Sequence, residues 1–514
     1  MALKATLKVN TGTTKRSYIS KFTHVDMKRM GRTPTAIVVT IATLCVVTPG
    51  TAIAHAFGAR YELPLPLWLW LVGAGAIVVL SFVLLGVFLR GGGEAFKEWR
   101  VDLMRIPGLR LLASSIFLRL LRAISVGLFL LIIAAGFFGD QTTTKNIAPV
   151  LVWVIWWVGL AYVSALCGDL WRIINPWSTL FFLAENLVPR LKKRGLRRFP
   201  AKVGAWPAVG LFFIFTWLEI VSDAGEVPAD LSIIILGYSA ITWAGMARYG
   251  REVWLGNAEA FSVCFGLLAR FAITEGGDAR WRLRPPAVGL IGEQPLSVSM
   301  VAFVVLLLAA VSFDGIAETP FWANILGWFA ENQALRPLLI AAQELGVDLA
   351  KLIKTLGLVA VPLISLVVYL LFNWRAASAD GGSNKLWLVA GALVLTLIPI
   401  AIAYHLSHYF SYLMLAGQLA ISLASDPFGV GWNLFGTADR AVDISVVSAK
   451  MVWYLATVAV VAGHVFAVYL GHIASLRLFA SRRDALMSQV PLLLLMVGYS
   501  MLSLWILAQP IINL

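Results

Sequence analysis

Histidine is scarce in this chain, and four of its six histidines fall in the last third. His405 and His408 are three residues apart, a spacing that puts both side chains on one face of a helix. His464 lies in the next apolar stretch, and consecutive helices are usually neighbours in space. Because imidazole is the commonest metal ligand, this pattern predicts a site for a divalent metal ion, of unknown identity, formed by His405, His408 and His464.

Other roles for these histidines remain open at this stage. His472 follows His464 by eight residues, which places it about 12 Å further along a helix and about 80° around it, away from the predicted ion. The same imidazoles would also suit a proton relay, or haem ligation by neighbouring helices. A purely structural role, with hydrogen bonds to Ser407, tyrosines or backbone carbonyls, is the fourth alternative.

Carboxylates occur at the ends of two apolar stretches, where they meet the boundary of the predicted membrane region. Glu219 shares a helix face with Asp223, and Asp314 follows a long apolar run. A carboxylate at such a position can orient a ligating histidine, complete a metal site or act as a general base. We therefore predict Glu219 and Asp314 as catalytic residues, with Asp223 as a solvated helix end.

The N-terminal region resembles an export signal. A polar, basic segment reaches Arg32, an apolar stretch covers 36–54, and Ala52 and Ala54 satisfy the small-x-small rule for signal peptidase. We expect residues 1–54 to be a signal peptide or a retained signal anchor, and residues 55–514 to form a multi-span membrane domain. Cleavage after Ala54 would make His55 the N-terminal residue, whose free amine and imidazole could chelate copper(II) as a further metal ligand.

The composition indicates that most of the chain is surrounded by lipid and not by water. Of the 514 residues, 60% are hydrophobic and only 13% are charged, about half the charge usual in a soluble domain. The net charge of +14 comes from Lys and Arg in a few loops, as expected when charge encodes orientation rather than nucleic-acid binding. Three cysteines give no disulfide framework, and no phosphate loop, dinucleotide fingerprint, HExxH or nucleophile elbow occurs.

The hydropathy pattern predicts an all-α, polytopic transmembrane helix bundle of about ten spans after the signal sequence. We expect these spans at 67–89, 120–139, 149–167, 206–221, 231–247, 296–313, 353–372, 386–415, 451–473 and 490–507. With this alternation every basic loop falls on one side, which predicts a multi-pass bacterial inner-membrane protein with cytoplasmic basic loops.

Two regions depart from simple alternation. Segment 254–273 is apolar but contains Glu259 and Arg270, which favours an interfacial or re-entrant segment. Segment 386–425 is too long for one upright helix and contains Pro399, which favours a kink, a tilt or a continuation along the surface.

Several motifs spread along the chain resemble the membrane-bound fenitrothion hydrolase family. They are HAFGARYELPLP from His55, GDLWRIINPW from Gly168, GREVWL from Gly250, ASDPFG from Ala424 with NLFGT from Asn433, and GHVFAVYLGH from Gly463. The resemblance implies hydrolysis of organophosphorus triesters such as fenitrothion, releasing a nitrophenol and a dialkyl thiophosphate. It also implies a role in organophosphate degradation and a complex with a second membrane subunit.

The leading hypothesis is therefore a metal-assisted membrane hydrolase acting on an apolar substrate that partitions into lipid. Handling or transport of copper or another metal would use the same histidines. A haem- or quinone-linked redox subunit is the third hypothesis.

Overall fold

The structure is a computed structural model that describes residues 64–89, 99–188, 191, 197–277, 280–292, 294–380 and 386–509. The predicted signal segment 1–54 and His55 lie outside the described residues. Helices dominate the described part of the chain, and the predicted all-α helix bundle is confirmed.

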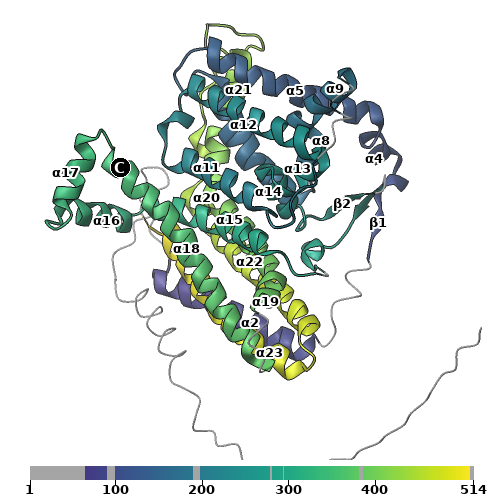
Figure 1. Cartoon of the computed structure of the whole chain (residues 1–514), viewed down its shortest axis with the longest axis vertical. Helices are drawn as coiled ribbons and strands as arrows, with labels where there is room; N and C mark the ends of the chain where they lie inside the picture. Colours follow the sequence, from purple (N-terminus) through teal and green to yellow (C-terminus); the bar gives the residue numbers. More distant parts are fainter. Residues whose placement is uncertain are drawn as a thin grey trace, which may run out of the picture.

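The elements follow one another along the chain as shown in Figure 1. The α-helices are α2 (Leu67–Phe88), α4 (Pro107–Leu112), α5 (Ser115–Phe138), α6 (Ile147–Pro149), α7 (Leu160–Leu166), α8 (Trp171–Ile174), α9 (Pro176–Leu187), α11 (Trp206–Ile220), α12 (Pro228–Tyr249), α13 (Arg251–Asn257), α14 (Ala260–Leu268), α15 (Val298–Ala317), α16 (Pro320–Glu331), α17 (Arg336–Glu344), α18 (Leu349–Ala377), α19 (Leu386–Leu393), α20 (Leu397–Ala416), α21 (Leu419–Ser425), α22 (Ala449–Leu478) and α23 (Arg482–Leu507). A π-helix (Val150–Gly159) joins α6 to α7, and the strands are β1 (Val101–Asp102), β2 (Thr274–Gly277) and β3 (Arg280–Leu283).

Nine helical stretches in the described part of the chain are long and apolar enough to cross a bilayer, which needs about 20 residues. They are Leu67–Phe88, Ser115–Phe138, Ile147–Leu166, Pro228–Tyr249, Val298–Ala317, Leu349–Ala377, Leu386–Ser425, Ala449–Leu478 and Arg482–Leu507. Each coincides with a predicted span. The remaining predicted span, 206–221, is the 15-residue helix α11, which is apolar but short.

Polar side chains fix where several of these helices begin. Ser114, Ser297, Ser448 and Ser481 each precede a long helix, and each hydroxyl accepts a hydrogen bond from a backbone N–H of the first turn. Asp348 does the same for α18. These caps accept hydrogen bonds from N–H groups that have no partner within the helix. The start of each helix is therefore fixed by a specific capping side chain as well as by hydropathy.

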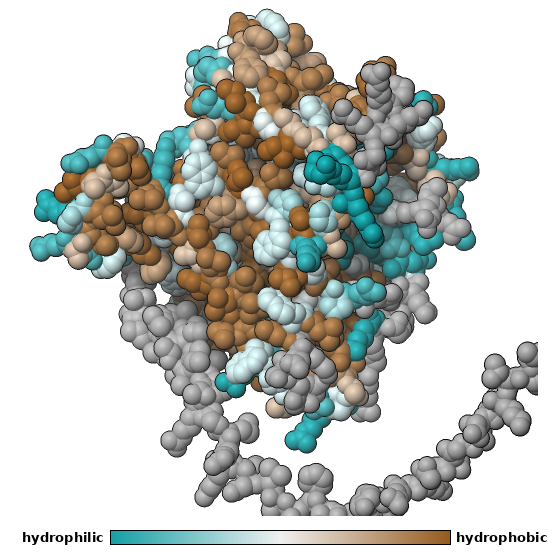
Figure 2. Space-filling view, viewed as in Figure 1, coloured by the Kyte–Doolittle hydropathy of each residue, from teal (hydrophilic) through white to brown (hydrophobic). Residues whose placement is uncertain are grey.

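Two helices form the centre of the bundle. In the most apolar 18 residues of α15, 72% of the residues are buried, and in those of Leu386–Ser425 78% are buried. The corresponding fractions are 6% for α5 and 11% for α18. Helix α20 packs against α15 and α22, and α15 packs against α11 and α18. The outer helices therefore present their side chains to lipid, and Figure 2 shows hydrophobic residues over most of the visible face.

The long apolar segment 386–425, for which the sequence left a kink, a tilt or a continuation along the surface open, is not one continuous α-helix. A 3₁₀ turn (Val394–Thr396) separates α19 from α20 three residues before Pro399, whose ring is incompatible with the α-helical carbonyl four residues earlier. A second interruption at Gly417 and Gln418 separates α20 from α21.

Segment 254–273 forms the short helices α13 and α14, and α14 is almost entirely buried among α7, α8 and α11. Glu259 caps α14, because its carboxylate accepts hydrogen bonds from the N–H groups of Phe261 and Ser262 and from the Tyr238 hydroxyl. Glu259, a charged residue within an apolar stretch, is thus accounted for by its hydrogen bonds to neighbouring residues.

A small antiparallel sheet, in the order β1-β3-β2, lies beside the bundle (Figure 1). Glu275 on β2 bridges two arginines, with 2.6 Å to Arg100 Nε and 3.2 Å to Arg284 Nη1. Arg284 also donates to the backbone carbonyls of Ala269, Arg270 and Ala272. The sheet therefore ties the segment after α14 to the segment before α4.

Helices α16 and α17 project from the body of the bundle between α15 and α18 (Figure 1). Both carry exposed apolar side chains, including Phe321, Trp328, Leu338 and Leu345.

Candidate functional site

The most concentrated group of ionisable side chains lies where α15 ends against α20. Asp314 is in the last turn of α15, and Glu318 is the first residue after that helix. His408 lies in the second half of α20. Because α15 and α20 are the central helices and pack directly on each other, their polar side chains meet inside the bundle and not at its surface.

Asp314, Glu318 and His408 converge closely. His408 Nε2 is 2.8 Å from Asp314 Oδ2, and the potential ligand atoms of all three residues lie within 4.8 Å of one another. Among the described residues, this is the group of three or more such side chains that could hold a metal ion. The side chains of His408 and Asp314 are 12% and 18% exposed, so the group is largely enclosed but not sealed.

A third carboxylate joins this group through a tyrosine. The Tyr409 hydroxyl is 2.6 Å from Asp314 Oδ2 and 3.2 Å from Glu219 Oε1. The indole N–H of Trp157 donates to the same Glu219 oxygen at 2.6 Å. Glu219 is in the last turn of α11, so three helices and the π-helix supply one connected polar network.

The close approach of α15 to α20 depends on Gly315. A Cβ atom at this position would lie 2.7 Å from the Tyr404 hydroxyl and 3.7 Å from His408 Nδ1. The Tyr404 and His408 rings are nearly parallel, with centroids 6.4 Å apart. The absence of a side chain at Gly315 therefore leaves room for the Tyr404 and His408 side chains directly beside Asp314.

Glu318 lies beyond the end of α15 and outside the membrane-spanning stretch. Burial raises the pKa of its carboxyl group, and a positive charge on His408 would oppose that rise. A carboxyl group in such surroundings gains from a nearby cation, because the cation compensates for the lost solvation of the charged form.

His405 adjoins the network without sharing its ion site. Its ring packs against Trp157, Tyr162 and Tyr409, with a centroid distance of 4.7 Å to the last. The predicted His405–His408–His464 set does not form in the structure, because His408 groups with Asp314 and Glu318 instead. The spacing of His405 and His408 places them on neighbouring parts of one helix face. Their contacts differ, because His405 packs against Trp157 and Tyr162 whereas His408 contacts Asp314.

The other histidines have separate partners. His464 Nδ1 lies 2.8 Å from the carbonyl oxygen of Val460 within α22, and its ring centroid is 6.1 Å from that of Tyr499. His472 Nδ1 and Nε2 are each 3.0 Å from an oxygen, one of Gln489 and one of the Leu89 backbone. His472 is thus a buried structural histidine away from the site, which agrees with its predicted displacement from the ion.

Among the carboxylates, the structure brings together Glu219 and Asp314 as a pair bridged by Tyr409. Asp223 is elsewhere and forms an exposed ion pair with Lys351, at 2.6 Å. Sequence reasoning missed Glu318 and Tyr409. Glu318 stands four residues after Asp314, a spacing that would have placed both on one helix face, and Tyr409 directly follows His408.

The donor set suits a divalent metal that accepts oxygen and nitrogen ligands. Two carboxylates and one imidazole are ligands for zinc, manganese or iron(II), and three protein ligands leave coordination positions open for water or substrate. Glu219, held by Trp157 and Tyr409, lies next to this set without being part of it.

Comparison with known proteins does not assign this site. No protein-family model, curated protein or solved structure matches the chain.

Proposed function

We propose that the chain is a membrane hydrolase in which Asp314, Glu318 and His408 hold a divalent metal ion. The observation that carries this proposal is the convergence of those three side chains, within 4.8 Å, at the contact of the two most buried helices. Intramembrane ionisable residues are costly and mark functional sites by default. An open three-ligand set is typical of catalytic rather than structural metal sites.

The substrate class comes from the sequence motifs. The proposed substrate is an apolar organophosphorus triester such as fenitrothion, which would partition into lipid and reach a site within the bundle from the side. A metal ion at the three ligands would polarise the phosphoryl or thiophosphoryl group and make water more acidic. Water oxygen then forms a bond to phosphorus, the phosphorus–oxygen bond to the nitrophenol breaks, and the remaining product is a dialkyl thiophosphate.

We assign Glu219 as the general base that accepts the proton of the attacking water. Its carboxylate lies beside the ligand set but outside it, held by Trp157 and bridged through Tyr409 to Asp314. A base in this position takes the proton that the attacking water loses. Trp157 and Tyr409 are positioning residues, since they act through Glu219 and Asp314.

The proposed setting is a bacterial inner membrane, with the basic loops in the cytoplasm and the site near the outer face. Asp314 and Glu219 both lie at helix ends opposite the basic loops in that orientation. A second membrane subunit is part of the proposal, so activity is to be measured with the neighbouring genes co-expressed and without them.

The decisive experiment compares Glu318→Gln and His408→Ala with the wild type for nitrophenol release and for bound metal after purification. Both variants are expected to lose bound metal and to lose activity by more than about 100-fold, beyond what residues that only support a ligand usually cost. Glu226→Gln, an exposed carboxylate near the same membrane face, serves as the control and should leave both unchanged. Wild-type activity and metal content in both site variants would refute the proposal.

Metal transport is a second candidate, favoured by one further observation. The Nε2 atoms of His405 and His464 are buried and have no hydrogen-bond partner, so two more imidazole nitrogens are available, one on α20 and one on α22. Uptake of zinc, manganese or copper into proteoliposomes, without triester hydrolysis, would favour this function over the hydrolase.

A further inference from the structure

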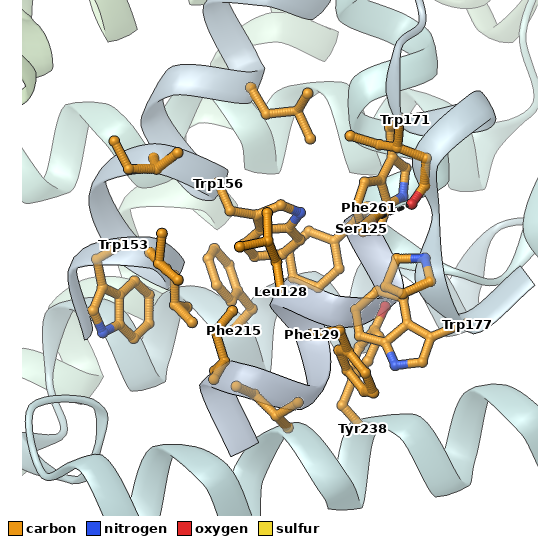
Figure 3. A pocket seen from close by; sticks show the side chains of 18 of the residues that line it. Ser125, Leu128, Phe129, Trp153, Trp156, Trp171, Trp177, Phe215, Tyr238 and Phe261 are labelled. Atoms are coloured by element: carbon orange, nitrogen blue, oxygen red, sulfur yellow. Dashed lines mark hydrogen bonds between the residues drawn. The ribbon is translucent and has the colours of Figure 1, made fainter. Parts of the chain in front are cut away.

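A large apolar cavity is lined by Trp156 and Phe215 and by none of the residues of the carboxylate site. It has a volume of about 760 Å³ and is bounded by α5, the π-helix, α11 and α12. Such a volume is typical of sites for drug-sized or larger apolar ligands. Figure 3 shows its aromatic lining, with Trp153 at one end and Trp171, Trp177 and Tyr238 at the other.

The cavity is partly open, and several of the side chains that line it are exposed. Ile124, Leu128 and Ile155 line it, and they are 50%, 44% and 40% exposed. They belong to α5 and the π-helix, which are parts of membrane-spanning stretches. The cavity is therefore accessible to molecules dissolved in the bilayer.

Two polar groups inside this apolar lining lack partners. The indole N–H groups of Trp156 and Trp171 are buried, and neither has a hydrogen-bond acceptor. Both nitrogen atoms are enclosed by protein and cannot be reached from the cavity, so the cavity offers a bound molecule an almost wholly apolar lining.

A polar cavity of about 550 Å³ adjoins the apolar one, and Trp171 lines both. The segments between the two cavities have apolar and polar residues next to each other in sequence. Consecutive residues on α5, on the loop before α9 and on α14 contribute an apolar side chain to one cavity and a polar one to the other: Leu121 and Arg122, Pro176 and Asn175, and Phe261 and Ser262.

The polar cavity is lined by more basic than acidic side chains: Arg122, Arg172 and Arg251 against Asp169 and Glu252. Arg251 is paired with Glu185 and Glu252, at 4.0 and 3.4 Å. Arg122 and Arg172 have no carboxylate within 4.0 Å in the described part of the chain, and Arg122 Nε donates to the Ile173 carbonyl. Asp169 also lines this cavity and feels the charge of Arg172.

We propose that the two cavities together bind one anionic phospholipid. Its acyl chain fills the apolar cavity, its glycerol part lies beside Trp171, which lines both cavities, and its phosphate lies against Arg122 and Arg172. An apolar cavity joined to a cationic one matches the order of groups in a glycerophospholipid. Basic pockets between helices on the side of the basic loops are where anionic head groups bind. This proposal does not depend on the metal site.

The test uses the full-length protein in detergent, freed of lipid, and native mass spectrometry as the readout. Phosphatidylglycerol and phosphatidylcholine with identical acyl chains are titrated, together with glycerol phosphate as the head group alone. We expect preferential retention of phosphatidylglycerol, weak retention of phosphatidylcholine and none of glycerol phosphate. Equal retention of the two lipids would overturn the anionic site, and retention of glycerol phosphate alone would reassign it to a soluble anion.

Arginine variants test the head-group end. Arg122→Gln and Arg172→Gln should each weaken phosphatidylglycerol binding by about fivefold, the usual contribution of one basic residue near a membrane surface, without changing phosphatidylcholine binding. Arg119→Gln is the matched control, since Arg119 lies one turn earlier on α5 and does not line the cavity. An equal effect of all three substitutions would mean that only the overall charge matters, which would refute the site.

A filling substitution tests the acyl end. Gly237 lines the apolar cavity, and a Cβ atom there would have no neighbour within 4 Å, so Gly237→Phe can occupy the cavity without displacing the fold. Displacement of two buried methylenes already weakens lipid binding by about tenfold. Gly127→Phe, at an equally open glycine of α5 outside the cavity, is the control. Unchanged retention in Gly237→Phe would show that the chain binds elsewhere.

Discussion

At the scale of single residues, Gly315 has the most direct influence on the Asp314–His408 pair. We predict that Gly315→Ala lowers stability by about 1–3 kcal/mol, because the new methyl group overlaps the Tyr404 hydroxyl at 2.7 Å and approaches Ile506 at 3.0 Å. Thermal unfolding in detergent and metal binding should both report the loss.

Gly127→Ala is the control for this change, because a Cβ at Gly127 meets nothing within 4 Å. It should leave the melting temperature unchanged or raise it slightly, since alanine is favoured over glycine in a helix by up to about 1 kcal/mol. Equal melting temperatures for the two variants would contradict the close packing described for Gly315.

The residue types at the site could be predicted in part. Glu219, Asp314 and His408 stand out in the sequence because charged side chains are rare in apolar stretches, and the structure brings these three into one network. The predicted grouping of His408 with His405 and His464 did not form, since helix spacing gives the face of a residue but not which helix that face meets. Glu318 was missed although its spacing from Asp314 was visible.

At the scale of elements, the three-stranded sheet depends on the charge of Glu275. Burial by itself raises the pKa of this carboxyl group, but Arg100 and Arg284 outweigh that effect and hold the pKa below its usual range. The stabilisation is therefore fully present above the ordinary glutamate pKa and is lost as the pH falls through the lowered value.

We predict that Glu275→Gln opens the sheet at neutral pH in the way that acid opens it in the wild type. The change should cost about 1–3 kcal/mol locally, because it removes a charged acceptor from Arg284, whose side chain is only 9% exposed. Hydrogen exchange of the β2 and β3 amides measures the effect. Wild-type protection in the variant at neutral pH would show that the ion pairs do not hold the sheet.

The broken segment 386–425 shows what length and proline could predict at this scale. Its forty residues and Pro399 indicated an interruption, and the structure has one at Val394–Thr396. The second break, at Gly417 and Gln418, has no comparable single cause in the sequence. The burial of α14 was likewise unpredictable, because an apolar run with Glu259 fits an interfacial helix equally well until the partners Tyr238 and Ser262 are known.

At the scale of the whole molecule, the short helix α11 decides the topology. Its 15 residues extend about 22 Å, less than the roughly 30 Å of hydrocarbon. We predict that it still crosses, with the bilayer locally thinned. Five helical stretches then separate Arg198 from Ala438: α11, α12, α15, α18 and Leu386–Ser425.

A reporter fused after Arg198 should therefore behave as cytoplasmic, and one fused near Ala438 as periplasmic. If α11 did not cross, the two fusions would report the same side. The all-helical architecture itself was predictable because hydropathy and helix length leave few other ways to satisfy a backbone in lipid. The central position of α15 and α20 was not predictable, because their hydropathy does not distinguish them from the outer helices.

The π-helix Val150–Gly159 connects the two proposed ligand sites, the apolar cavity and the carboxylate group, and would couple them if both are occupied. Trp156 faces the apolar cavity, while Trp157, the next residue, donates its N–H to Glu219, and Phe215 packs against both indoles. A lipid that shifted this segment on entering the cavity would alter the surroundings of the carboxylates. Because the coupling free energy between two sites is the same in both directions, occupation of the carboxylate site would then change the affinity for that lipid by the same factor.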